Sequence, residues 1–508
     1  MKKLVRFLTS RLFITGLLIL VQLGWLYLQF TRLTRYSVPI SMALTLLSVA
    51  MVFVILRRDE NPAYKLLWVV FIAVSPLLGG LLYAMWGNKR PGRRMRRALE
   101  AARAPIRPLL AQPPQPMDAL TAEHPRISAT ARYVARYGPY PVQQNTEVDY
   151  YPIGEALFAA MLEEMERAEK FIFLEYFIYA EGEMWQAMRR VLAQKAAQGV
   201  DVRLIFDDMG CLGVLPKRFW AGLEKDGIRC LPFNPFVPVA SLVMNNRDHR
   251  KMLIVDGHTA FTGGINIADE YINRTSPHGH WKDTGIRLRG DAVWNYTLMF
   301  LEMWNAFRRT DTAYERFLPP AQPRPQAKGW VQPFSDSPLD TEPLSESVYL
   351  DILNQARRYV YIFTPYLIID NEMQTALCLA AKRGVDVRIV TPGIPDKWIV
   401  WQLTRSYYER LMEAGVKIYE YTPGFIHAKS YLSDDRIGVV GTINMDFRSL
   451  YLHFECGALL IDTPCLADLK ADALATFEKS QLVRPCDLRG GLVGDLLRSA
   501  LRLFAPLC

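Results

Sequence analysis

The chain of 508 residues has few of the residues that hold metals or disulfides. Its seven cysteines are scattered and form no C-x-x-C pair, which argues against a structural zinc site or a disulfide framework and favours reduced, mostly buried thiols. Its seven histidines show no H-E-x-x-H or comparable spacing. We therefore expect no metal and no cofactor.

A basic surface is also missing from most of the chain. The formal net charge is +9, yet residues 1–100 alone carry +12, and the remaining residues carry −3. The larger part therefore lacks the charge typical of a nucleic acid-binding protein, and we expect no nucleic acid partner. The basic residues lie beside apolar segments, where they indicate membrane orientation and contact with anionic lipids.

Long apolar runs are present near the N-terminus. Residues 12–30 and 37–56 are long enough to span a bilayer, and a third run, 63–86, is interrupted by Pro76 and two glycines. The N-terminus and residues 89–97 are both basic, so both favour the cytoplasmic side, which requires an even number of crossings. We therefore expect residues 1–88 to be a multi-pass membrane region in which 63–86 is a re-entrant or interfacial hairpin.

One short pattern occurs twice. His249-Arg250-Lys251 followed by Asp256 recurs 178 positions later as His427-Ala428-Lys429 followed by Asp434, so both copies read H-x-K-x4-D. In both, six residues lead to a turn that ends in Asn, at Asn266 and at Asn444. A lone H-x-K pattern has no meaning, but a duplicated one with a common downstream turn indicates a site.

The residue types in the pattern suit phosphate chemistry. Alternation along a strand places His249 and Lys251 on one face and Arg250 on the other. Lysine supplies a point charge and the Asn amide supplies donors, while an imidazole serves as nucleophile or as acid and base near neutrality. Two such sets facing each other would let one His attack phosphorus while the other protonates the leaving oxygen. The two motif aspartates, Asp256 and Asp434, allow a second interpretation, because they also fit a structural role as turn caps.

The rest of the chain divides into two repeats. Residues 89–118, basic and then Pro-rich, are expected to be a linker, followed by a first repeat (119–308), a connection (309–342), a second repeat (343–484) and a tail (485–508). In each repeat a helical pattern precedes a β-rich run: 156–170 then 171–179, and 348–358 then 359–369. Further strands are predicted at 204–206 and 389–391. This order predicts an α/β fold with mixed sheets covered by helices.

Two apolar segments allow two interpretations each. Residues 233–244 fit either a buried loop or a lip that enters lipid beside the site. The tail residues 493–504 place an apolar stripe on one helical face, which suits either packing or an interfacial helix.

The doubled motif resembles that of the phospholipase D superfamily. Residues 171–178, 199–203, 280–283 and 364–366 and the apolar N-terminus further resemble its bacterial cardiolipin synthase branch. The resemblance implies two pseudo-symmetric α/β/α sandwich repeats and a location in the bacterial inner membrane, with the catalytic part in the cytoplasm. Dimerisation is left open.

The resemblance also implies roles for single residues. One His forms a phosphohistidine and the other acts as acid and then base; His249 is favoured as the nucleophile on resemblance alone. The catalytic set is completed by the Lys and Asp of each motif, and Lys251, Lys429, Asn266 and Asn444 would hold the phosphate oxygens. Asp283 and Glu455 are the positions that look equivalent to the carboxylates that orient the histidines. In the family this turn often carries Ser. Here the position is Gly264 in the first repeat and Thr442 in the second, which argues against a hydroxyl contact to phosphate in the first repeat.

The expected activity is that of a membrane-bound phosphatidyltransferase. Two phosphatidylglycerol molecules would yield cardiolipin and glycerol through a phosphatidyl-histidine. The alternatives are a phospholipase D-type hydrolase or a transferase that uses another alcohol, such as serine. A non-enzymatic lipid-binding scaffold is disfavoured, because both motifs are complete.

Overall fold

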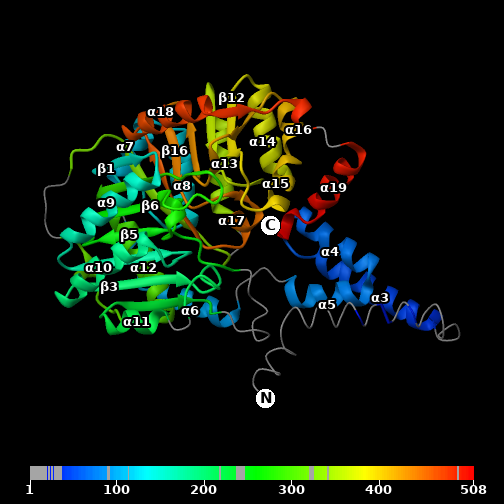
Figure 1. Cartoon of the computed structure of the whole chain (residues 1–508), viewed down its shortest axis with the longest axis horizontal. Helices are drawn as coiled ribbons and strands as arrows, with labels where there is room; N and C mark the ends of the chain where they lie inside the picture. The colour runs from blue at the N-terminus through cyan, green and yellow to red at the C-terminus, as the bar shows by residue number, and fades with distance from the viewer. Residues whose placement is uncertain are drawn as a thin grey trace, which may run out of the picture.

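The computed structural model describes residues 37–87, 92–111, 114–216, 219–235, 246–319, 325–339, 342–488 and 491–507, with Leu20, Leu23, Gly24 and Tyr27. Two mixed sheets lie next to each other and share one hydrophobic core (Figure 1). The first sheet contains, in spatial order, β1 (Thr146–Tyr151), β8 (Gly285–Gly290), β6 (Thr259–Gly263), β5 (Met252–Val255), β2 (Phe171–Tyr176), β3 (Asp201–Asp207) and β4 (Arg229–Phe233).

The second sheet repeats this arrangement. It contains β19 (Ser480–Leu482), β13 (Lys417–Tyr421), β12 (Asp386–Pro392), β10 (Tyr359–Phe363), β15 (Ser430–Ser433), β16 (Ile437–Gly441), β18 (Glu455–Ile461) and β9 (Trp330–Asp336). In each sheet three parallel strands, β2-β3-β4 or β10-β12-β13, adjoin an antiparallel set that begins with the motif strand, β5 or β15. The predicted α/β fold of two pseudo-symmetric repeats with mixed sheets is confirmed.

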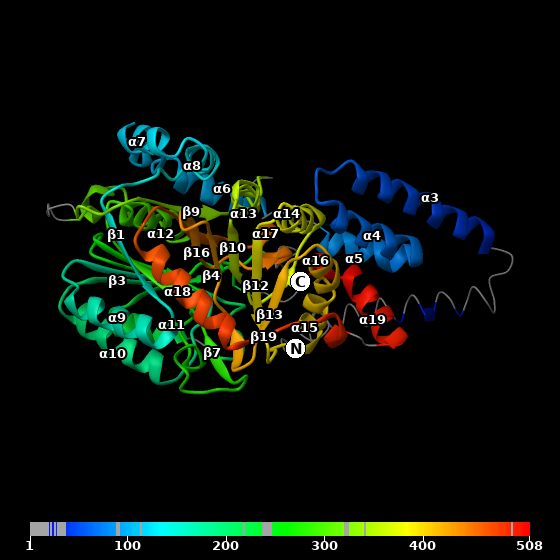
Figure 2. The ribbon, with the colours of Figure 1, turned by 90° about the horizontal axis from the view of Figure 1, so that it is seen from above.

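Helices cover the sheets because each carries an apolar face (Figure 2). Those of the first repeat are α9 (Gly154–Arg167), α10 (Glu183–Ala197), α11 (Phe219–Lys225) and α12 (Val293–Phe307), whereas α8 (Ile127–Tyr137) packs into the hydrophobic cluster of the second repeat. Those of the second are α13 (Leu344–Gln355), α14 (Asn371–Lys382), α15 (Trp398–Arg405), α16 (Tyr408–Glu413), α17 (Phe447–Tyr451) and α18 (Cys465–Glu478). Twelve of the fifteen residues of α12 are buried, because it packs against β5, β6 and β8 and also against β9 of the other sheet.

The first β-run of each repeat falls where the sequence predicts it. β2 begins at Phe171 and all six of its residues are buried, as expected for an internal strand covered on both faces. β10 begins at Tyr359, and the short β11 (Leu367–Ile368) completes the predicted 359–369 run. The helices before them, α9 and α13, begin two and four residues earlier than predicted, at Gly154 and Leu344.

Two predicted connections contain more structure than expected. The supposed linker 89–118 includes α6 (Arg93–Arg103), η1 (Arg107–Leu110) and the start of α7 (Gln115–Glu123). α6 docks on α12 through the buried Leu99 and an Arg103–Glu302 ion pair of 2.9 Å. The connection 309–342 includes β9, so the second sheet begins before the predicted boundary of 343. Pro333 hides this strand in the sequence, but an edge strand tolerates proline.

The N-terminal helices form a small layer beside the second repeat (Figure 1). α3 (Ser37–Leu56), α4 (Pro62–Val74) and α5 (Pro76–Trp86) share a cluster that includes the buried Ile55, Trp68 and Ile72. The third apolar run is thus two helices broken at Ser75, where Pro76 begins a new first turn. No helix in the described ranges combines the length and apolar character needed to cross a bilayer. The predicted spans are therefore not confirmed, and most of the run at 12–30 lies outside the described residues.

The two ambiguous apolar segments have different outcomes. Phe233 is buried at the end of β4, but residues 236–245 lie outside the described part, so the lip stays a prediction. The tail forms α19 (Gly491–Leu503), which contacts α4 and α15, and Phe504 packs edge-on against Phe71 at 5.8 Å between ring centres. Leu496 on the same helix is 62% exposed, so the stripe is only partly used for packing. The six described cysteines are free, and four of them are buried.

Candidate active site

The two motifs are brought together by backbone pairing between the repeats. His249 N donates to Phe454 O at 2.9 Å, one residue before Glu455. His427 N donates to Lys282 O at 2.7 Å, one residue before Asp283. The second of these contacts continues a parallel pair of short strands, β14 (Gly424–Ile426) with β7 (His280–Lys282). Each histidine segment therefore lies against the segment of the other repeat that carries the predicted orienting carboxylate.

The His–carboxylate pairs consequently cross between repeats. His249 Nδ1 lies 2.8 Å from Glu455 Oε1, and His427 Nδ1 lies 2.7 Å from Asp283 Oδ2. Both carboxylates are fully buried. A carboxylate accepts the Nδ1 proton, so it fixes the tautomer in which Nε2 has a free lone pair. The structure thus brings together four predicted site residues, with partners that the sequence did not assign.

The surroundings of both imidazoles favour the neutral ring. Burial, with the nearby Lys251 charge next in weight, lowers the pKa of His249 well below its usual value. Burial and then the Lys429 charge lower the pKa of His427 to about 4, against the opposing effect of Asp283. A neutral imidazole with a free Nε2 is the nucleophilic form. An anion that entered between the lysines would oppose their charge and raise the pKa of both rings.

The two lysines are buried beside the histidines. Each Nζ donates to the carbonyl oxygen of its own motif histidine, at 2.6 Å for Lys251. Burial lowers the pKa of Lys251 to about 8 and that of Lys429 to about 7. Among the described residues neither lysine has an ion-pair partner, so two buried ammonium groups form a strong site for an anion such as a phosphodiester.

The two asparagines are buried in the same region. Asn266 accepts from Ile178 N at 3.1 Å and donates to the Tyr271 hydroxyl at 2.6 Å, and the Tyr271 ring lies 5.3 Å from the ring of His427. Asn444 donates to Asp446 Oδ2 at 3.0 Å. Each amide nitrogen keeps a second hydrogen, so a phosphate contact stays a prediction for both residues.

The two motif aspartates lie at the far ends of the motif strands. Asp256 accepts three backbone N–H groups of residues 169–171, at 2.7 to 2.8 Å. Asp434 does the same for residues 357–359, at 2.8 to 3.0 Å. Both have a left-handed backbone, with φ of 51° and 56°. Of the two alternatives, this geometry favours the turn-capping role and does not place either aspartate among the reacting groups.

The turn residues Gly264 and Thr442 have different structural roles. The Thr442 hydroxyl donates to Glu455 Oε2, so it supports the carboxylate and not a phosphate. At Gly264 a side chain would clash with the Asp283 carboxylate, which occupies the equivalent space. Asp283 Oδ1 instead accepts from Thr284 N at 2.8 Å.

Arg250 points away from the reacting groups, as strand alternation predicts. Its guanidinium pairs with Glu175 at 2.5 Å and with Asp248 at 3.1 Å, and it lies over the Phe454 ring. Glu175 belongs to the β2 run whose sequence contributed to the family resemblance. Its role is to neutralise a buried cation behind the motif.

One histidine of the site escaped prediction from the sequence. The ring of His453 lies 5.6 Å from that of His249, and its Nδ1 is 4.0 Å from Glu455 Oε1. Its only sequence signal is its place two residues before Glu455, outside both motifs. Within the described residues, His249, His453 and Glu455 form a set whose potential ligand atoms lie within 4.8 Å of one another. The positive charges of Lys251 and Lys429 beside His249 favour an anion over a metal ion at this place.

The fold and the site define a two-repeat protein with two neighbouring, carboxylate-backed histidines, as in the phospholipase D-like class. Residues 161–276 and 349–479 match the family described as cardiolipin synthase, PLD-like domain, and residues 46–88 match the family described as phospholipase D-nuclease N-terminal. A protein of Geobacillus thermodenitrificans named cardiolipin synthase is 34% identical over 93% of this chain and 93% of its own. The chain belongs to the cardiolipin synthase family.

Two further proteins are similar to this chain. An uncharacterized protein of Streptococcus mutans is 45% identical over 87% of this chain and 95% of its own. The crystal structure of a phosphatidylserine synthase of Haemophilus influenzae covers 75% of this chain and all of that chain, with a TM-score of 0.57 and 15% identity. This last likeness shows the shared fold.

Proposed function

We propose that this protein is a phosphatidyltransferase that makes cardiolipin and glycerol from two molecules of phosphatidylglycerol. The observation that carries the proposal is the pair of histidines, each backed by a buried carboxylate from the other repeat, beside two buried lysines. Relatives named cardiolipin synthase support the proposal, and the apolar N-terminal helices suit a lipid substrate.

In the first step, His249 Nε2 attacks phosphorus and the bond from phosphorus to the glycerol oxygen breaks. His427 Nε2 gives its proton to the departing oxygen, so free glycerol leaves and a phosphatidyl group stays on His249. Burial lowers the pKa of His427 to about 4, so the ring gains this proton as the anionic substrate enters and opposes the lysine charges. Glu455 and Asp283 stabilise the positive charge that develops on each ring.

In the second step, His427 takes the proton from a glycerol hydroxyl of the second phosphatidylglycerol. That oxygen attacks phosphorus, the N–P bond breaks, and cardiolipin is released. The lysines offset the charge on the phosphate oxygens in both steps, and Asn266 and Asn444 are placed to donate to them. A two-step path replaces one difficult displacement by two easier ones.

The associated partners follow from this reaction. Phospholipids are the substrates, and association with a membrane is expected of a relative of the bacterial cardiolipin synthases. A multi-pass arrangement in the inner membrane, with the two repeats in the cytoplasm, is part of the proposal, and dimerisation is left open.

The test is product analysis with the purified full chain and phosphatidylglycerol vesicles. Cardiolipin and glycerol in equal amounts are expected, without CTP or added metal, and His249→Ala and His427→Ala should make neither. Phosphatidic acid as the sole product would identify a hydrolase, and phosphatidylserine formed only when serine is added would identify a different transferase. Mass spectrometry of acid-quenched protein should find the phosphatidyl group on His249; finding it on His427 would exchange the two roles.

A further inference from the structure

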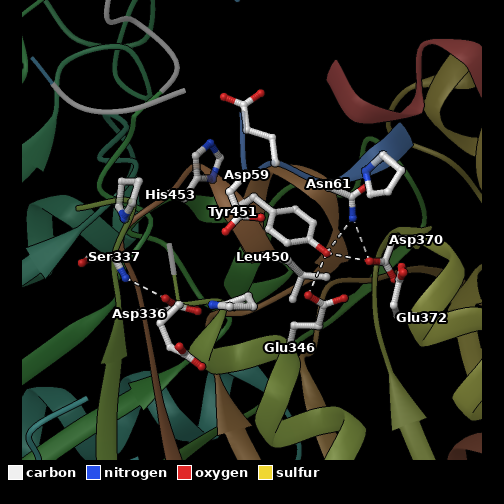
Figure 3. A pocket seen from close by; sticks show the side chains of 15 residues that line it. Asp59, Asn61, Asp336, Ser337, Glu346, Asp370, Glu372, Leu450, Tyr451 and His453 are labelled. Atoms are coloured by element: carbon white, nitrogen blue, oxygen red, sulfur yellow. Dashed lines mark hydrogen bonds between the residues drawn. The ribbon is translucent and has the colours of Figure 1, made fainter. Parts of the chain in front are cut away.

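A cavity of about 340 Å³ lies beside His453, and its lining is acidic (Figure 3). The Tyr451 hydroxyl in its wall lies 2.7 Å from carboxylate oxygens of both Glu346 and Asp370. Asn61, in the turn between α3 and α4, donates to Asp370 at 2.9 Å. Burial, and then the charge of Asp370, raise the pKa of Glu346 to about 8, so the two acids share one negative charge near neutrality. These contacts give the cavity a structural role, because they attach the N-terminal helices to the second repeat.

The two sides of the proposed active site differ in the rings beside each histidine. On one side, the ring of His249 has His453 at 5.6 Å and Phe177 at 5.1 Å, so the cavity lies on the side of the attacking group. In the proposed reaction the alcohol leaves and enters on the other side, at His427. There the ring of Tyr271 lies 5.3 Å from that of His427, at an angle of 75°. Tyr271 thus brings a phenol to the side on which the alcohol gains and loses its proton.

The hydrogen of the Tyr271 hydroxyl has no acceptor among the described residues. The N–H of Ile178 can only donate, so the Asn266 atom that faces it at 3.1 Å is Oδ1. The amide nitrogen of Asn266 therefore faces Tyr271 and donates to its oxygen at 2.6 Å. Burial raises the pKa of Tyr271 well above its usual value, and the charge of Glu270 adds to this effect, so the hydroxyl keeps its own hydrogen. Tyr271 is only 3% exposed, and a buried donor without an acceptor is costly, so a ligand oxygen would stabilise it.

Tyr271 is held firmly with respect to His427. It lies in η2 (Asp269–Ile272), and the next residue, Asn273, has a left-handed backbone with φ of 53°. The Asn273 side chain accepts from Trp281 N at 2.7 Å and donates to Trp281 O at 3.0 Å. Trp281 is the central residue of β7, which pairs with β14 directly before His427, and its ring packs against Tyr271 at 5.1 Å. The strand pair that places His427 therefore also places the phenol.

The equivalent position in the second repeat has a different role. Tyr271 stands five residues after Asn266, and Ser449 stands five residues after Asn444. Asn444 donates to Asp446 Oδ2 at 3.0 Å, and Asp446 caps α17 by accepting from Ser449 N at 2.8 Å. The phenol therefore distinguishes the two halves of the site, although their motifs are nearly identical.

We infer that Tyr271 recognises the alcohol, because its hydroxyl donates to the glycerol hydroxyl group adjacent to the reacting oxygen. This inference rests on the proposed function and adds to it the residue that selects the alcohol. The departing glycerol and the accepting phosphatidylglycerol both carry a hydroxyl group next to the oxygen that reacts, so one donor serves both steps. A simple primary alcohol would leave the phenol hydrogen unpaired, so transfer to it should be disfavoured.

The test compares two alcohols that differ by this one hydroxyl group. Full-length protein is given phosphatidylglycerol vesicles with equal concentrations of 1,2-propanediol and 1-propanol, and mass spectrometry measures the ratio of the two phosphatidyl products. The wild-type protein should prefer the diol. Tyr271→Phe should lower this preference about three- to tenfold, the order of one lost hydrogen bond, with the loss falling on the diol product.

A matched control variant separates recognition from packing. The Tyr314 hydroxyl also accepts from an asparagine, Asn305 Nδ2, at 3.3 Å, and Tyr314 is 4% exposed at a place outside the site. Tyr314→Phe makes the same chemical change and should keep the wild-type preference. Both products come from the same folded enzyme, so partial unfolding of a variant would lower their amounts and leave their ratio unchanged.

Three outcomes would overturn the inference. A wild-type protein without preference for the diol would show that the adjacent hydroxyl group is not recognised. An unchanged preference in Tyr271→Phe would show that another group recognises it. An equal loss of both products in Tyr271→Phe would show that Tyr271 acts on the phosphate through Asn266. A wild-type protein that transfers to both alcohols but makes no cardiolipin would contradict the proposed function, and its diol preference would still decide the role of Tyr271.

Discussion

Each motif histidine pairs with a carboxylate of the other repeat, and this crossed pairing leads to a prediction. If each histidine paired with the carboxylate of its own repeat, the opposite result would be expected. Asp283→Asn removes the acceptor of His427 in the other repeat, and Glu455→Gln removes that of His249. A hydrogen bond that involves a charged group contributes about 1.5–3 kcal/mol, and the fully buried positions leave no water to replace it. Each variant should therefore lose about 10- to 150-fold in the rate of cardiolipin formation.

The leaving group distinguishes the two variants. A p-nitrophenyl ester of the phosphatidyl group leaves without a proton, so it needs the nucleophile but not the acid. With this substrate, Asp283→Asn should retain a near-wild-type burst of p-nitrophenol, because it disturbs only His427. Glu455→Gln should lose the burst, because it disturbs His249. The assay is stopped-flow absorbance over one turnover.

Two burst results would contradict this prediction. A full burst in both variants would show that the carboxylates do not act through the histidines. A burst lost in Asp283→Asn and kept in Glu455→Gln would make His427 the nucleophile. With the p-nitrophenyl substrate, Asp283→Asn combined with His427→Ala should give the same burst as His427→Ala alone, whereas Glu455→Gln combined with His427→Ala should lose the burst.

Four other outcomes are expected. Tungstate mimics phosphate, and its charge is constant near neutrality. It should inhibit less as pH rises from 7 to 9, because Lys429 and Lys251 lose their protons with pKa values of about 7 and 8. An inhibition constant independent of pH would contradict this. Its binding at pH 7 should take up protons, measured by calorimetry in buffers of different ionisation enthalpy, and proton release would count against the neutral histidines. Asp256→Asn should lower stability by about 1–3 kcal/mol in urea unfolding while the remaining folded enzyme keeps its kcat, and a large loss of kcat without loss of stability would restore a catalytic role. Thr442→Val should slow cardiolipin formation several-fold through Glu455, with unchanged rates as the contrary result.

Local pattern was sufficient for much of the fold. The β2 and β10 runs, the helices before them and the doubled motif could be placed from the sequence, because side-chain periodicity and turn chemistry act over a few residues. The strand β9 was missed because Pro333 and its Pro-rich surroundings resemble a connection. The docked helix α6 was missed because its charge hides the short apolar face around Leu99.

The sequence by itself determined which residues of this protein carry chemistry: the doubled His and Lys, and two carboxylates whose importance followed from resemblance. Only the tertiary structure decided which carboxylate serves which histidine. The pairs join residues 144 and 206 positions apart, and they cross because each histidine segment forms backbone hydrogen bonds with the other repeat. The same long-range pairing brings His453 to the edge of an acidic cavity, a relation that no local pattern encodes.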